Sequence, residues 1–164
     1  MSQRPKLNLP LTSLDWLYEG AAVIVMAFFV WSLLDSYADL PETIPTHFNH
    51  KGEADGFSSK SSLWLLPGIA FATYLGLIVV NRMPHKFNYP IDITEENAAY
   101  QYRLATRMIR VINLSVVVIF YLVAREILLA GFESQGGMGG FLLPIILLLT
   151  LFPIIVYLIL ASRA

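Results

Sequence analysis

The stretch FLLPIILLLTLFPIIVYLILAS, residues 141–162, contains no charged residue. A helix crosses the roughly 30 Å hydrocarbon core of a bilayer with about 20 apolar residues, so this stretch is long enough to span a membrane. Because lipid offers no hydrogen-bond partners to the backbone, a spanning segment of this length must be helical. The sequence therefore predicts a transmembrane helix at 141–162.

Three more windows have the same character, at 16–38, 62–81 and 111–132. The whole chain agrees with them, since 56% of its residues are hydrophobic, only 14% are charged, and its mean hydropathy is +0.61. The sequence predicts an all-α integral membrane protein, a bundle of four transmembrane helices forming a single domain over 1–164. The charged residues inside the four windows are Glu19, Asp35, Arg125 and Glu126.

Composition also excludes several classes of function. The chain has no cysteine, which excludes disulfides, thiol nucleophiles and cysteine-ligated metals. Its net charge of −1 gives no basic field for nucleic acid. No catalytic motif is present, so we expect no enzyme and no cofactor, with the lipid bilayer as the surroundings of the helices.

Lysine and arginine are unequally divided between the two sides of the predicted bundle. Eight lie in the N-terminal segment, in the 82–110 connection and at the C-terminus, whereas the 39–61 loop holds only Lys51 and Lys60. By the positive-inside rule, both termini are cytoplasmic and the 39–61 loop is external. In a bacterium this describes a multi-pass protein of the inner membrane.

The two longer connections have different characters. In the external loop, Ile44–Phe48 and Phe57–Lys60 are expected to pair as a small hairpin across His50–Gly56, with Phe48 and Phe57 resting on the helix ends. In the cytoplasmic segment 82–110, Thr94 is a helix N-cap.

Nothing after that cap breaks a helix before Gly131. We therefore expect one helix over about 95–130, a cytoplasmic extension leading into a third span at about 108–131.

The charges within the windows are expected to pair. Helices 1 and 3 both run from the cytoplasm outward, so Glu19 lies at the depth of Arg110, and Asp35 at the depth of Arg125. Unpaired charges in a membrane are costly, which predicts the ion pairs Glu19–Arg110 and Asp35–Arg125 between the two helices. A proton or ion path is the alternative interpretation.

Small residues recur every four positions on the second helix, at Gly68, Ala72 and Gly76. Such spacing allows close packing of two helices in lipid. It is compatible with a homo-oligomer or with a place in a larger membrane complex.

The most distinctive motif lies in the external loop and reads P-x-H-F-N-x-x-G-x-x-D-G. The motif consists of Pro45, His47, Phe48, Asn49, Gly52, Asp55 and Gly56. The motif and the stretch 88–107 resemble the domain-of-unknown-function family 1648, which includes the SdpI-like immunity proteins of bacteria. That resemblance implies a membrane fold unit and a role in immunity or sensing. SdpI-like proteins carry further membrane helices after this unit.

Three chemical interpretations of this loop remain open. His47 and His50, with Glu53 and Asp55 nearby, are residue types that bind zinc, but two histidines are an incomplete ligand set. A loop held by side-chain hydrogen bonds explains the same residues. A rigid outward loop is also a recognition surface for a peptide or protein.

We therefore predict an accessory protein of the bacterial inner membrane whose external loop recognises a peptide or protein. A structural subunit of a larger membrane complex is the alternative, and a metal-dependent membrane enzyme is a third possibility.

Overall fold

The computed structural model describes residues 4–132 and 139–163, and these form four long helices and one hairpin. The helices are α1 (Ser13–Tyr37), α2 (Leu65–Val80), α3 (Ala98–Phe132) and α4 (Leu142–Ala161). Short 3-10 turns precede α2 and follow it, η1 (Lys60–Trp64) and η2 (Pro84–Lys86). Helices α1, α3 and α4, and α2 together with η1 (Lys60–Val80), are each long and apolar enough to cross a membrane, which confirms the predicted fold class.

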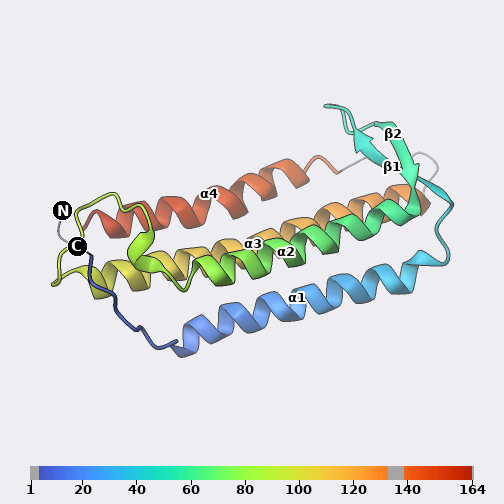
Figure 1. The fold of residues 1–164 in the computed structure, drawn as a ribbon. Helices are drawn as coiled ribbons and strands as arrows, with labels where there is room; N and C mark the ends of the chain where they lie inside the picture. The colour runs from blue at the N-terminus through green and yellow to red at the C-terminus, as the bar shows by residue number, and fades with distance from the viewer. Residues whose placement is uncertain (1–3, 133–138, 164) are drawn as a thin grey trace.

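The helices lie side by side, and the described chain begins and ends at the same end of the bundle (Figure 1). The hairpin lies at the opposite end. We call these the terminal end and the hairpin end. Helix α3 packs against each of the other three helices, whereas α1 and α2 touch each other little. The main core joins Phe29 and Leu33 of α1 to Ala124, Ile127 and Leu128 of α3.

Most large apolar side chains on the other helices face outward. Ile24 of α1 is 70% exposed and Leu143 of α4 is 65% exposed. In water such a surface would be unstable, but in a bilayer it is the surface that lipid covers. Helix α3 has three neighbours, and it accordingly buries the polar residues Gln101, Asn113 and Ser115.

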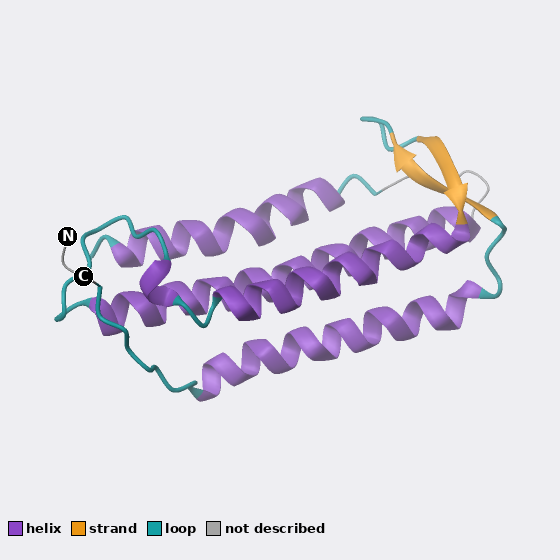
Figure 2. Cartoon of the chain, viewed as in Figure 1, coloured by secondary structure: helices purple, strands orange, loops and turns teal. Residues whose placement is uncertain are grey.

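Helix α3 begins close to the predicted cap. Thr94 and Asn97 exchange side-chain and backbone hydrogen bonds of 2.9 and 3.3 Å just before Ala98. The helix then continues without interruption for 35 residues. Its first turns extend beyond the end of α2, as Figure 2 shows.

The hairpin consists of β1 (Thr43–Phe48) and β2 (Ala54–Ser59), which pair antiparallel with Phe48 opposite Ala54. The predicted second strand, Phe57–Lys60, was therefore placed too late in the chain. The actual turn closes earlier because the side chain of Asn49 accepts hydrogen bonds from the backbone N–H groups of Lys51 and Glu53. Lys60 begins η1 instead of ending the strand.

The base of the hairpin is docked on the end of α3. Ile44 of β1 is fully buried and belongs to the main core together with Leu40. A Cβ placed on Gly131 of α3 would lie 3.1 Å from Leu40 Cδ2 and 3.3 Å from Ile44 Cγ2. The glycine thus allows the hairpin to approach the helix closely.

Candidate functional site

The turn of the hairpin is organised by Asn49. Its Oδ1 accepts hydrogen bonds from the backbone N–H groups of Lys51 at 2.8 Å and Glu53 at 3.1 Å. Its Nδ2 donates to Glu53 Oε2 at 2.9 Å. Gly52 has a φ of 81°, a conformation that glycine adopts without steric cost. The turn is therefore a closed unit with a defined shape.

His47 and Asp55 form a polar pair beside this turn. His47 Nδ1 contacts Asp55 Oδ1, and the two side chains are 73% and 44% exposed. Gly56 lies opposite His47 in the strand pairing, and a Cβ at position 56 would lie only 2.8 Å from His47 Cβ. The motif glycine thus makes room for the histidine of the pair.

Other residues of the hairpin either anchor it to the bundle or are exposed. Pro45 is buried, and Phe48 packs against the main core. Phe57 was expected to rest on the helix ends, but it is 62% exposed. Strand β1 packs on α3 while β2 makes no comparable contact with a helix, so β2 stands away from the bundle. Phe57 is therefore a displayed aromatic residue, which the loop motif did not include.

Metal ligation by the hairpin gains no support from the geometry. Across residues 4–132 and 139–163, no group of three histidine or carboxylate side chains is placed to hold a metal ion. His50 is exposed in the turn, and Nδ1 of His47 is engaged by Asp55.

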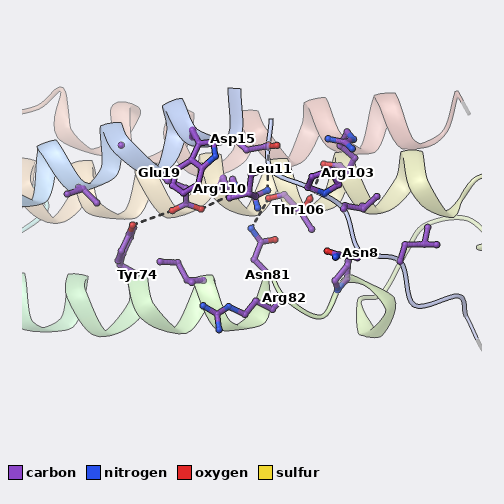
Figure 3. Close-up of a pocket in the computed structure, with 18 of the residues that line it drawn as sticks. Asn8, Leu11, Asp15, Glu19, Tyr74, Asn81, Arg82, Arg103, Thr106 and Arg110 are labelled. Atoms are coloured by element: carbon purple, nitrogen blue, oxygen red, sulfur yellow. Dashed lines mark hydrogen bonds and ion pairs between the residues drawn. The ribbon is translucent and has the colours of Figure 1, made fainter. Parts of the chain in front are cut away.

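A second polar cluster lies toward the terminal end, between α1 and α3 (Figure 3). Arg110 Nε is 3.2 Å from Glu19 Oε1, so the structure brings together the first of the two predicted pairs. The Nε–H lacks hydrogen-bond alignment, and the contact is ionic. Tyr74 of α2 donates its hydroxyl to Glu19 Oε2 at 3.3 Å. Three helices thus meet at one carboxylate.

Asp15 completes this cluster, and sequence reasoning missed it. It is only 3% exposed, its Oδ1 accepts from Arg107 Nε at 3.4 Å, and it lies 3.6 Å from Arg110 Nη1. It also caps α1 reciprocally with Thr12, through bonds of 2.8 and 3.3 Å. A threonine followed three residues later by an acid before an apolar run was the signal available in the sequence.

The second predicted pair, Asp35–Arg125, is wrong. Arg125 Nη1 contacts Glu126 on its own helix at 2.9 Å, and both Asp35 and Arg125 are exposed. Leu33 is the residue that α1 buries at this level. Asp35 follows two positions later, about 200° around the helix, so it points away from α3.

The small residues of α2 lie on its outer surface. Gly68, Ala72 and Gly76 are all exposed. A Cβ added at either glycine would meet nothing within 4 Å. Within the part of the chain that the structure describes, this stripe therefore does not pack against another element.

The segment before α1 contacts the start of α3 and the residues that precede α3. The sequence patterns did not predict these contacts. Arg4 lies over the Tyr89 ring, 5.4 Å from its centroid, and Tyr102 donates its hydroxyl to the Pro5 carbonyl at 3.1 Å. Burial raises the pKa of Tyr89, the nearby Tyr157 and Tyr102 raise it further, and Arg4 opposes them. Tyr89 thus stays a neutral donor, and it donates to the Pro84 carbonyl at 2.9 Å.

A protein-family model matches the central part of the chain. Residues 23–71 match the family model described as Domain of unknown function (DUF1648). The DUF1648 match begins within α1, includes the whole hairpin and ends within α2. It therefore contains the loop motif, whereas the Glu19–Arg110 contact lies outside it.

The chain is also similar to an archaeal protein. An uncharacterized protein of Archaeoglobus fulgidus is 34% identical over 109 residues, which cover 58% of this chain and 52% of the relative. The chain thus spans about half the length of that relative. No solved structure matches the chain.

Proposed function

We propose that this multi-pass membrane protein recognises a peptide or protein through its β1–β2 hairpin. The observation that carries the proposal is the combination of a turn held closed by Asn49 with an exposed His47–Asp55 pair and an exposed Phe57. A loop whose shape is already fixed loses little conformational entropy on binding. Exposed aromatic and polar side chains on such a loop are typical of recognition surfaces.

Strand β2 offers a further means of recognition. It pairs with β1 on one side, and in the described part of the chain no strand pairs with its other edge. An extended peptide can add to such an edge through backbone hydrogen bonds, with side-chain contacts giving specificity. Phe57 and Asp55 lie on this strand and would contribute those contacts.

The proposed sidedness places the hairpin outside the cytoplasm. Eight lysine and arginine residues lie at the terminal end or in the connection there, and two lie in the hairpin loop. With the resemblance to SdpI-like immunity proteins, this supports an immunity or sensing role for an inner-membrane protein. The ligand would then be a secreted peptide or the external part of another membrane protein.

The experiment compares partners of the native chain with those of a hairpin variant. The full chain is isolated from its host in mild detergent, and associated peptides and proteins are identified and quantified by mass spectrometry. The variant is Asp55→Asn/Phe57→Ser, and the control is Arg163→Gln at the terminal end. We expect one stoichiometric partner that the hairpin variant loses and the control retains. A partner retained by both variants would overturn the proposal.

A second candidate function, a subunit of a larger membrane complex, is favoured by one observation. The Gly68, Ala72 and Gly76 stripe faces outward, where another helix could approach α2 closely. Replacing Ala72 by Phe would then abolish association in detergent while leaving hairpin binding intact. Unchanged association in that variant would exclude the stripe as an interface.

A further inference from the structure

A groove runs between α1 and α2, and residues of α3 line it at the terminal end. It exists because both helices pack along α3 while touching each other little. At the terminal end it opens into a cavity of about 890 Å³ (Figure 3). A second cavity of about 550 Å³ continues from it toward the hairpin end. Val23 and Tyr74 line both cavities, so the two form one continuous groove.

The chemistry of the lining changes along this groove. The part at the terminal end contains the charged residues Asp15, Glu19, Arg82, Arg103 and Arg110. The continuation is lined by apolar side chains apart from the Tyr74 hydroxyl. These residues are Ala22, Val23, Met26, Ala27, Val30, Trp31, Leu34 and Phe71. A groove that is charged at one end and apolar along the rest matches an amphiphile lying along the bundle.

Among the described residues, the arginines at the polar end are not all paired with carboxylates. Asp15 is engaged by Arg107 and Arg110, and Glu19 by Arg110. Among the residues that the structure describes, no carboxylate lies within 4.0 Å of Arg82 or Arg103. Two arginines with no acid within ion-pair distance therefore line the same cavity, and charge complementarity calls for an anion there.

The position of these arginines suits a lipid headgroup. Arg82 directly follows the C-cap of α2, Asn81, and so lies at the level where a spanning helix leaves the hydrocarbon. Arginine binds phosphate oxygens through paired N–H donors. Trp16, beside the same cavity, is 64% exposed, as expected for an aromatic residue at a membrane interface.

We infer that the groove between α1 and α2 binds an anionic phospholipid of the surrounding bilayer. The phosphate lies against Arg82 and Arg103, and one acyl chain follows the apolar lining past Ala27. A soluble phosphate ion would make no favourable contact with the apolar continuation of the groove. The inference does not depend on the hairpin, which lies at the other end of the bundle.

Tryptophan fluorescence can report on lipid bound at this site. Of its three tryptophans, Trp16 lines the polar cavity and Trp31 the apolar one. Trp64 lies at the hairpin end, so a Trp64→Tyr background leaves only the groove reporters. The full chain is reconstituted in phosphatidylcholine vesicles that contain a varied fraction of brominated phosphatidylglycerol or brominated phosphatidylcholine. Bromine quenches tryptophan at short range, so half-quenching measures local lipid occupancy.

We expect brominated phosphatidylglycerol to quench at a lower fraction than brominated phosphatidylcholine. Each arginine at a membrane surface contributes about fivefold to the affinity for anionic lipid, so Arg82→Gln/Arg103→Gln should remove the preference. The matched control Lys6→Gln/Arg163→Gln removes the same charge from exposed positions at the same end and should keep it. Equal quenching by both lipids in the parent Trp64→Tyr chain, or equal loss of preference in both double variants, would overturn the inference.

The acyl-chain part is tested separately with Ala27→Phe. The larger side chain fills the apolar continuation without touching the arginines. We expect it to weaken quenching by phosphatidylglycerol severalfold while the fold, followed by circular dichroism, is kept. An unchanged response would mean that only surface charge attracts the lipid, which would contradict a lipid held in the groove.

Discussion

Arg110 of α3 lies with its Nε 3.2 Å from Oε1 of Glu19 of α1, and both side chains are largely buried. The contact joins two helices that are separated in the chain by the hairpin and by α2. Arg110 Nη1 also lies 3.6 Å from Asp15 Oδ1. Arg110 therefore contacts two carboxylates of α1, and its removal would leave Glu19 without an arginine partner while Asp15 keeps Arg107.

Arg110→Gln should destabilise the bundle strongly. Removing one partner of a buried ion pair costs about 3–5 kcal/mol because the remaining charge stays desolvated. The matched control on the same helix is Arg125→Gln, whose arginine is 51% exposed and should cost under about 1 kcal/mol. Reversible unfolding in mixed micelles measures both. Equal losses of stability would show that the cluster at Asp15 and Glu19 does not hold α1 in place.

Double-mutant cycles should separate the two ion pairs expected from the sequence. Glu19→Gln with Arg110→Gln should show a coupling energy of about 1–3 kcal/mol, as found for residues in direct contact. Asp35→Asn with Arg125→Gln should be additive, since Asp35 points away from α3. A large coupling in the second cycle would mean that α1 is rotated relative to the arrangement described above.

Gly56→Ala should open the hairpin without unfolding the helices. The added Cβ would lie 2.8 Å from His47 Cβ, and overpacking of this kind costs about 1–3 kcal/mol. Gly20→Ala is the control, because a Cβ there meets nothing within 4 Å. Hydrogen exchange of the β1 and β2 amides should accelerate only in Gly56→Ala. Unchanged exchange would show that His47 yields to the methyl group.

The sidedness of the hairpin can be measured directly because the chain has no cysteine. Single substitutions Ser58→Cys on β2 and Ser162→Cys after α4 place one thiol at each end, both at exposed positions. In intact cells, an impermeant maleimide should label Ser58→Cys, and Ser162→Cys should react only after permeabilisation. The reverse pattern would place the hairpin in the cytoplasm and remove the proposed external recognition.

The four spans were predictable from the sequence because burying charge in lipid is costly. Long windows without charge, such as 62–81 and 141–162, can only be helices that cross the bilayer. The observed ends of α2, with its preceding turn, and of α4 differ from those windows by one or two residues. The pairing of Glu19 with Arg110 was also accessible, since residue counting gives depth along a helix.

Depth does not give direction around a helix, and the Asp35–Arg125 prediction failed for that reason. Which face of α1 meets α3 is decided by the packing of Phe29 and Leu33 against Ala124 and its neighbours. The same packing decides that Asp15, rather than Asp35, has arginine partners on α3.

The sequence by itself determined the number of spans, the motif of the loop and the depth of each charge along its helix. Each of these depends only on the composition of one local segment of the chain. Only the tertiary structure decided that α1 and α2 separate over α3, leaving a groove with Arg82 and Arg103 at one end. It also decided that Phe57 is displayed while Pro45 is buried. Both outcomes depend on how helices and strands distant in the chain pack together, and no local pattern records that.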